Sequence, residues 1–349
     1  MKKYLGTLAL GLSLTVLSGC AGAEPAPGAG ALSEHPPVTL SVWLASWDAE
    51  RGEQEYKKIK RQAESLSCFM AYYDKDDKLF IPQETRSIAA FAQKEGQKQR
   101  YLSITNDRQD EKGKFVAKDK ELLRRLLVDE AGKEAVAAEM TAAAKELGCT
   151  GLELDYEAFF KDKELLQEYL DFTYKLASAC LKEHLALRIV LEPGMPMDAG
   201  LCKGPEYVVM FYNLYGTHSG PGPKADFAFI EKTIKKMEAL PGKKAAAFAT
   251  GGCQWEDYVS LGDKKGKVRN VDEAEAVQLA EKHHATPVRD EKSHALHFAY
   301  QAEGHEYVVW YADSETLNAW IGAAARGGLD RVSLWRLGGN DTIKEIKLN

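Results

Sequence analysis

Short apolar runs rich in valine, isoleucine and aromatic residues alternate with longer stretches of helical periodicity from Thr39 onward. This alternation is typical of a parallel sheet in which a helix follows each strand. The predicted strands span residues 39–45, 67–73, 100–105, 151–157, 186–191, 207–212, 244–250 and 331–335. The predicted helices span residues 53–65, 84–94, 130–147, 163–183, 226–239, 271–283 and 314–326.

The alternation is interrupted in two places. Residues 193–206 are too few and too rich in proline and glycine for a full helix. Residues 295–300 and 307–311 read as a hairpin around Glu303 and Gly304, placed between the seventh and eighth strands. Eight strands favour an α/β fold of the (β/α)8 TIM-barrel type with a small hairpin insertion, and a doubly wound open sheet is the alternative.

The first residues have the pattern of an export signal. Lys2 and Lys3 precede an apolar run at 4–16, which is shorter than the roughly 20 residues that a membrane-spanning helix needs. Residues 17–20, Leu-Ser-Gly-Cys, resemble the lipobox of bacterial lipoproteins, in which the cysteine is lipidated. The sequence therefore predicts a signal peptide at 1–19, a lipidated Cys20 with a flexible Ala, Gly and Pro tether at 20–37, and a folded domain at 38–349. A plain cleaved signal with an incidental cysteine is the alternative.

Charge and cysteine spacing exclude several kinds of partner. Loss of the signal leaves 44 basic against 52 acidic residues, a net charge near −8, which does not favour nucleic acid or an anionic membrane surface. We expect contact with the membrane only through the N-terminal lipid, on the extracytoplasmic side of the bacterial envelope, and a monomer.

The five remaining cysteines have no CxxC spacing and are an odd number, so buried unpaired thiols are expected; they are Cys68, Cys149, Cys180, Cys202 and Cys253. Histidines at 283, 284, 294 and 297 fit surface or capping roles, and no metal site is predicted.

Three acidic residues alternate along the predicted fourth strand. In a strand, Glu153, Asp155 and Glu157 point to one side, and Leu152 and its alternate neighbours point to the other. An edge strand with one solvated acidic face gives the same pattern, but both faces of a parallel sheet are covered. Like charges in a site with little water raise one another's pKa, so a carboxyl group here can stay protonated and act as a general acid.

This segment resembles the signature of glycoside hydrolase family 18, DGxDxDxE, at the end of the fourth barrel strand. Gly151 matches the glycine, Asp155 the last aspartate, and Glu157 the catalytic acid. Thr150 and Glu153 stand where the family has aspartates, so the hydrogen bond between the second acid and Asp155 differs from the usual one.

Further segments match the family in order. Residues 210–213 resemble its MxYD motif, in which Tyr212 holds the acetamido oxygen of the substrate, although Asn213 replaces the aspartate. Trp335 resembles the tryptophan that floors the subsite of the cleaved sugar. Residues 307–313 resemble the branch that acts on spore and cell-wall glycans, with weaker similarity at 103–106 and 220–223. The resemblance covers roughly residues 39–341 and implies a substrate-binding set of Glu153, Met210, Asn213, Trp335 and Asn106.

The resemblance implies a retaining glycosidase that needs no cofactor. Glu157 would protonate the glycosidic oxygen while the 2-acetamido oxygen of the sugar attacks its own anomeric carbon, with Asp155 and Tyr212 orienting that group. The expected substrates are glycans with β-1,4-linked N-acetylglucosamine, of peptidoglycan or chitin type. A lectin-like family member without turnover is the alternative function, and a structural lipoprotein on another α/β fold is a further one. Glu192 is a candidate cleft residue, and four aromatic residues fit either sugar stacking or core packing: Trp43, Trp47, Tyr72 and Tyr73.

Overall fold

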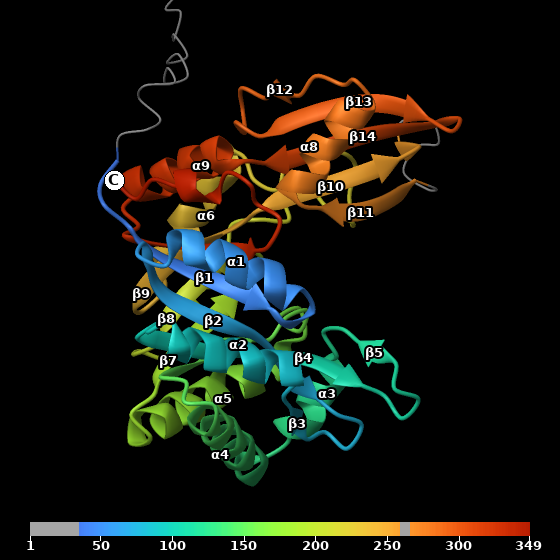
Figure 1. The fold of residues 1–349 in the computed structure, drawn as a ribbon. Coiled ribbons are helices and arrows are strands. Elements are labelled where there is room, and N and C mark those ends of the chain that lie inside the picture. The colour runs from blue at the N-terminus through green and yellow to red at the C-terminus, as the bar shows by residue number, and fades with distance from the viewer. Residues whose placement is uncertain (1–34, 259–265) are drawn as a thin grey trace, which may run out of the picture.

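Eight parallel strands close into a barrel at the centre of the molecule (Figure 1). The structure is a computed structural model and describes residues 35–258 and 266–349. The barrel strands are β1 (Thr39–Ala45), β2 (Ala63–Tyr73), β4 (Gln99–Gln109), β6 (Gly151–Asp155), β7 (Ala186–Leu191), β8 (Glu206–Met210), β9 (Lys243–Ala249) and β15 (Arg331–Leu337). Their order is β2-β1-β15-β9-β8-β7-β6-β4, and the pairing of β2 with β4 completes the ring. This closure confirms the (β/α)8 barrel and excludes the open sheet.

Helices cover the outside of the barrel. They are α1 (Ala49–Ile59), α2 (Gln83–Lys94), α3 (Lys120–Leu126), α4 (Glu130–Glu146), α5 (Lys163–Lys182), α6 (Phe227–Met237) and α9 (Ser314–Arg326). Aspartate side chains at the N-caps of α4, α5, α6 and α9 accept hydrogen bonds from first-turn N–H groups, which otherwise lack partners. The predicted helix at 53–65 was wrong at its end, because Ile59 ends α1 and residues 63–65 already belong to β2. Residues 193–205 contain no helix, as predicted.

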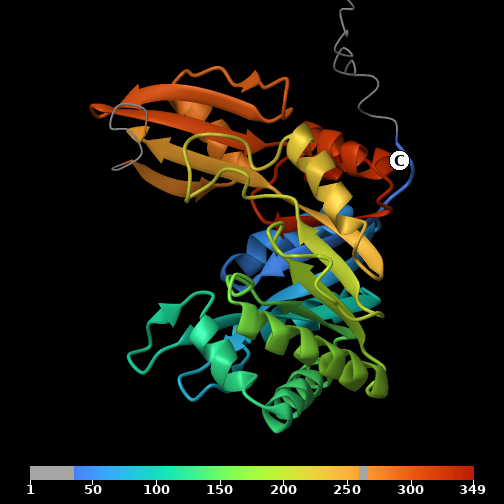
Figure 2. The ribbon, with the colours of Figure 1, turned by 180° about the vertical axis from the view of Figure 1, so that it is seen from behind.

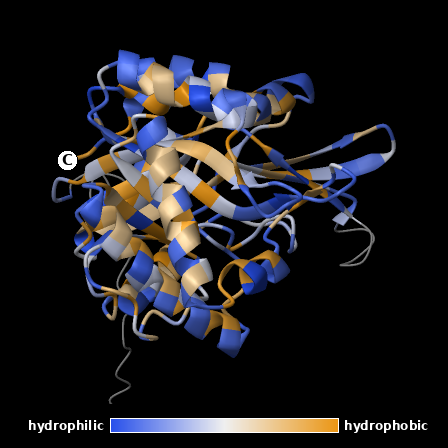
Figure 3. Ribbon diagram, turned by 90° about the horizontal axis from the view of Figure 1, so that it is seen from below, coloured by the Kyte–Doolittle hydropathy of each residue, from blue (hydrophilic) through white to orange (hydrophobic). Residues whose placement is uncertain are grey.

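Apolar side chains fill two zones. The outer zone lies between strands and helices and includes Leu152, Leu154 and Tyr156, the apolar face predicted for β6. The inner zone lies inside the barrel and includes Trp43 and Tyr72, which are therefore core residues. Figure 3 shows the apolar residues along the central strands and polar residues on the peripheral loops.

An antiparallel sheet is inserted between β9 and α9, beside the barrel (Figures 1 and 2). It consists of β10 (Gly251–Glu256), β11 (Lys267–Val271), β12 (Val288–Arg289), β13 (Leu296–Ala302) and β14 (His305–Ala312), in the order β11-β10-β14-β13-β12, with α8 (Glu273–Lys282) packed on it. The predicted hairpin is β13–β14, but the prediction of a small insertion was wrong. The glycines of β10 and the exposed polar residues of β11 hide the strand pattern, and the helix predicted at 271–283 belongs to this insertion.

Smaller elements extend the carboxyl ends of two barrel strands. The short strand β3 (Leu79–Phe80) pairs with β2, and β5 (Phe115–Val116) pairs with β4. The 3-10 turns η1 (Ser46–Asp48) and η3 (Ile343–Glu345) follow β1 and β15.

The N-terminal predictions lie outside the described residues, which begin at 35; these are the signal at 1–19, Cys20 and all but the end of the tether. Within the described part of the chain, none of the helices has the length and apolar character that crossing a membrane requires. The five predicted thiols, Cys68, Cys149, Cys180, Cys202 and Cys253, are all buried and free.

Candidate active site

Strand β6 and the residues just after it bring three carboxyl groups to the inside of the barrel, one after another toward the carboxyl end of the strand. Its first residue must be small, because a Cβ atom on Gly151 would lie 2.7 Å from the carbonyl oxygen of Ala186 on β7. Glu153 is fully buried, Asp155 is the last residue of the strand and is 8% exposed, and Glu157 lies two residues beyond it. The predicted single acidic face is therefore present, although the strand ends two residues earlier than predicted.

Glu153 lies deepest and is neutralised by the protein itself. Its Oε2 lies 3.2 Å from Nη1 of the buried Arg188, and it accepts a hydrogen bond of 3.0 Å from Ser67 Oγ. Its Oε1 accepts hydrogen bonds from Ser103 Oγ, at 2.5 Å, and from Trp43 Nε1. These contacts use both carboxylate oxygens, so the prediction that Glu153 binds substrate was wrong: it is an interior ion-pair residue beneath the cleft.

Asp155 is buried and incompletely hydrogen-bonded. Its Oδ1 finds no hydrogen-bond partner among the described residues. Burial, followed by the negative charges of Glu157 and Glu153, raises the pKa of Asp155 well above its ordinary value. Burial therefore disfavours the charged form of Asp155, and its Oδ1 is a polar atom that a ligand can use.

Glu157 is held by Asn106, the residue that follows Thr105 on the neighbouring strand β4. The Asn106 side chain accepts a hydrogen bond of 2.9 Å from the Glu157 N–H and donates one of 3.1 Å to the Glu157 carbonyl oxygen. This two-point contact fixes the backbone from which the carboxyl group projects. It also occupies the amide that was predicted to bind substrate.

Lys118, in the loop between β5 and α3, donates a hydrogen bond to Glu157 Oε2. Burial raises the pKa of Glu157, the Lys118 ammonium lowers it, and Glu192 and Asp107 raise it further, with a net upward shift. Sequence reasoning missed Lys118, since no regular spacing connects it to β6. Glu192, the candidate cleft residue, does not line either cleft cavity, and its carboxylate accepts a hydrogen bond of 2.8 Å from the N–H of Ala158.

A cavity of about 470 Å³ opens above these carboxyl groups. Its lining contains most of the predicted site: Asp155, Glu157, Asn106, Met210, Tyr212, Asn213 and Trp335. Burial, and then the charges of Asp155 and Glu157, raise the pKa of Tyr212 well above its ordinary value, so the phenol keeps its proton. Trp335 packs edge-on against Phe69 at 4.5 Å between ring centroids and presents an aromatic wall to the cavity.

The cleft continues into a second cavity of about 550 Å³ toward the inserted sheet. Trp47, Lys118, Tyr212, Asn213 and Trp335 line both cavities. Trp47 is 57% exposed, so of the four aromatic candidates it is the one presented to the cleft. Tyr73 instead lies in the core, where its hydroxyl is hydrogen-bonded to that of Tyr156 at 2.6 Å.

The remaining sequence candidates lie elsewhere. Thr150 accepts a hydrogen bond of 2.9 Å from the Arg100 N–H at the start of β6 and does not line either cavity. His283 stacks on Tyr300, and His297 stacks on Trp310.

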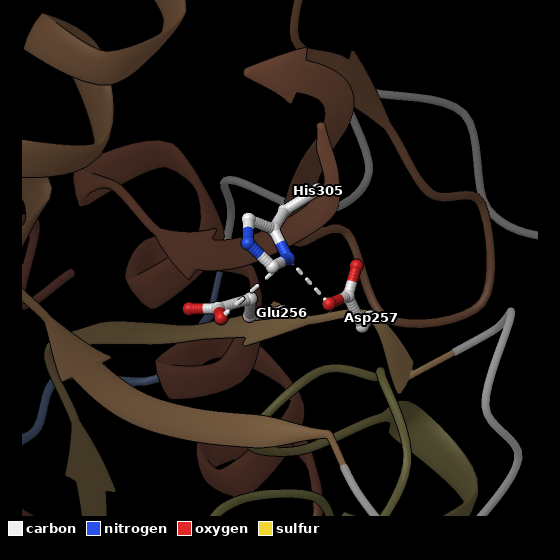
Figure 4. Close-up of side chains that lie close together, drawn as sticks. All are labelled: Glu256, Asp257 and His305. Atoms are coloured by element: carbon white, nitrogen blue, oxygen red, sulfur yellow. Dashed lines mark hydrogen bonds and ion pairs between the residues drawn. The ribbon is translucent and has the colours of Figure 1, made fainter. Parts of the chain in front are cut away.

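The described residues bring three potential metal ligands together at the far end of the inserted sheet (Figure 4). They are Glu256 and Asp257, at the end of β10, and His305, at the start of β14. The Asp257 carboxylate pairs with His305 Nδ1 at 2.6 Å and raises the pKa of this exposed histidine. Glu256 is paired with Lys267 at 2.9 Å. These two ion pairs explain why the three side chains lie together: they connect the end of β10 to the start of β14 and to β11.

Comparison with known proteins places these features in one family. The model of glycosyl hydrolases family 18 matches residues 40–341. No curated protein sequence matches the chain.

Solved structures share the fold at low sequence identity. A chitinase from Chromobacterium violaceum is 16% identical with a TM-score of 0.74, and the match covers 88% of this chain and 96% of that one. The spore cortex-lytic enzyme SleL of Bacillus cereus is 19% identical with a TM-score of 0.72, over 90% of this chain and 76% of that one. A class V chitinase from Nicotiana tobaccum, solved in complex with NAG4, is 15% identical with a TM-score of 0.69, and the match covers 89% of this chain and 97% of that one.

Proposed function

This chain belongs to family 18 of the glycosyl hydrolases, and from this premise we propose that it is a retaining glycosidase of N-acetylglucosamine-containing glycans. The observation that carries the proposal is the grouping of Glu157, Asp155 and Tyr212 around one cavity with an aromatic wall. Names of similar solved proteins, two chitinases and a spore cortex-lytic enzyme, support the same class of substrate.

The proposed reaction uses the substrate's own acetamido group as the nucleophile. Its carbonyl oxygen attacks the anomeric carbon, the bond from that carbon to the glycosidic oxygen breaks, and Glu157 gives its proton to the leaving oxygen. Water then attacks the same carbon and reopens the cyclic intermediate, while the Glu157 carboxylate takes the proton of the water. Two displacements at one carbon give net retention.

Asp155 and Tyr212 would hold the acetamido group during these steps. The Oδ1 atom of Asp155 has no protein partner among the described residues and is suited to accept from the acetamido N–H. The Tyr212 phenol, kept protonated by its surroundings, is suited to donate to the acetamido oxygen. The contact of Asp155 with the N–H would strengthen as positive charge develops on the acetamido group, and the Tyr212 contact would orient the oxygen for its attack.

The test compares the wild-type protein with Glu157→Gln on chito-oligosaccharides and purified peptidoglycan, with mass spectrometry of the products and NMR of the first anomer released. We expect cleavage with a β-anomer product and a loss of at least about a thousandfold in the variant, the scale of losing both acid and base catalysis. Glycan binding without cleavage by the wild type would support the lectin-like function instead. An α-anomer product would refute the retaining mechanism.

We also propose that the protein is exported and anchored to the bacterial envelope through a lipid on Cys20, on the basis of residues 1–20 alone. Labelling cells with a clickable palmitate analogue should label the wild-type protein and not Cys20→Ser. Equal labelling of the two would refute the anchor.

A further inference from the structure

The ammonium group beside the proposed acid has no role in the reaction described above. Lys118 contacts Glu157 Oε2, and its side chain is 44% exposed toward both cavities. A cation bound to a general acid favours the ionised form of that acid, which is the inactive form for protonating a leaving group. A group that draws the ammonium away from Glu157 would therefore favour the reaction.

The loop holds Lys118 firmly at its backbone and loosely at its tip. The Lys118 N–H donates a hydrogen bond of 2.7 Å to Asp107 Oδ1, and the Asp119 N–H donates one of 2.9 Å to the carbonyl oxygen of Asn106. Both contacts attach the loop to the end of β4. The long side chain can thus change partner without movement of the loop.

In the second cavity, positive side chains outnumber negative ones. The two carboxylates in the second cavity each pair with an arginine, Asp272 with Arg51 at 2.7 Å and Glu275 with Arg269 at 2.5 Å. Lys224 lines the same cavity, as does Lys118. The chain as a whole has a net charge of −6, so this local excess is not a property of the general surface.

We propose that Lys118 selects a glycan with a carboxylate next to the scissile bond, of the kind carried by a peptide-free muramic acid residue on the leaving side. This inference rests on the proposed glycosidase function. In such a sugar the leaving oxygen is attached to carbon 4, and a lactyl ether ending in a carboxylate is attached to the adjacent carbon 3. The group that takes the Glu157 proton and the carboxylate are therefore neighbours, as Glu157 and Lys118 are.

Binding of this substrate exchanges one ion pair for another. Lys118 moves from Glu157 to the lactyl carboxylate, and Glu157 keeps a proton to a higher pH, because the other titratable groups that interact with it among the described residues are acids and a phenol: Glu192, Asp107, Asp155 and Tyr212. A neutral chitin-type glycan leaves Lys118 on Glu157. The substrate's charge thus contributes both to binding and to protonation of the acid.

The experiment measures kcat/KM and the pH profile of kcat on three substrates: neutral chito-oligosaccharide, peptide-free strands of alternating N-acetylglucosamine and muramic acid, and the same strands with their carboxylates amidated. The wild type should prefer the charged strands over the amidated ones by roughly tenfold to a hundredfold, the ratio expected for one hydrogen bond between charged groups. Its kcat should also fall at a pH roughly one to three units higher on the charged strands, as expected for removal of a neighbouring opposite charge.

Lys118→Met should abolish both differences, and Lys118→Arg should retain most of the preference. Lys114→Met is the matched control and should behave as the wild type. Lys114 is exposed, lies on the other side of the short strand β5 from Lys118, and does not line either cavity. A preference that survives in Lys118→Met, or no preference in the wild type, would overturn the assignment of Lys118. Cleavage of neutral chito-oligosaccharide that is lost in Glu157→Gln establishes the glycosidase independently; no cleavage of any substrate overturns both proposals.

Discussion

Replacement of Asn106 by alanine is expected to slow the chemistry while leaving substrate affinity nearly unchanged. The side chain is 1% exposed, and its amide makes hydrogen bonds of 2.9 and 3.1 Å with the backbone of Glu157. Alanine removes both partners at once. The backbone N–H and carbonyl group of Glu157 would then be left unsatisfied or would shift toward water.

The structure sets the scale of the two effects. Each lost hydrogen bond leaves a buried polar group unpaired at about 1–2 kcal/mol, so the free energy of unfolding should fall by about 2–4 kcal/mol. A carboxyl group displaced by about 1 Å costs on the order of a hundredfold in rate, so kcat should fall by roughly ten- to a hundredfold. KM should change by less than about threefold, because the amide is already used by the protein.

The assay is steady-state hydrolysis of a chromogenic N-acetylglucosamine oligomer, with urea unfolding of the same preparations. Asn340→Ala is the control, since Asn340 is also buried and its side chain donates hydrogen bonds of 2.9 Å to Glu55 and 3.1 Å to the Arg336 carbonyl oxygen, away from Glu157. It should lose stability and keep kcat. A higher KM with normal kcat in Asn106→Ala would refute the positioning role and restore the direct substrate contact that the sequence predicts.

Two further substitutions test charges that the fold buries. Arg188→Met should lower the free energy of unfolding by about 3–5 kcal/mol, because it leaves Glu153 buried without its counter-ion. Adding Glu153→Gln to the same chain should recover part of the loss. A urea midpoint unchanged by Arg188→Met would contradict the ion pair. Burial raises the pKa of Glu273 from 4.5 to about 7, so the folded state binds a proton that the unfolded state has released, and stability contributed by this group is lost as pH rises from 4.5 to about 7. Glu273→Gln keeps an acceptor for Thr342 and should become more stable relative to the wild type by roughly 1–3 kcal/mol between pH 4 and pH 8, whereas parallel stability curves would contradict the shift.

The barrel could be predicted from the sequence because its strands carry a local signal. β1 and β7 occur with the predicted bounds, since each is a short apolar run bordered by polar residues. The inserted sheet was largely missed, because only β13 and β14 have a turn between two apolar runs. In β11 four of the five residues are at least partly exposed, and such a strand carries no apolar periodicity.

The candidate site, like the fold, could be predicted from the sequence only in part. Alternation along β6 was enough to place Asp155 and Glu157 at one cavity. The partners of these acids come from other strands and loops, 51 residues away for Asn106 and 39 for Lys118, so no local pattern identifies them. The local pattern therefore predicts the carboxyl groups that line the cavity but not the groups that contact them.

The charge state of β6 follows from which acid obtains a partner. Three ionised carboxylates this close together would destabilise the barrel, and the surroundings of each carboxyl group differ. Glu153 pairs with Arg188, burial raises the pKa of Asp155, and Glu157 contacts the exposed Lys118. Arg188 is itself buried, so the partner of Glu153 cannot move into the cleft. The outermost acid, Glu157, has a partner with an exposed side chain, so its protonation can respond to what binds in the cleft while the buried pair of Glu153 and Arg188 stays in place.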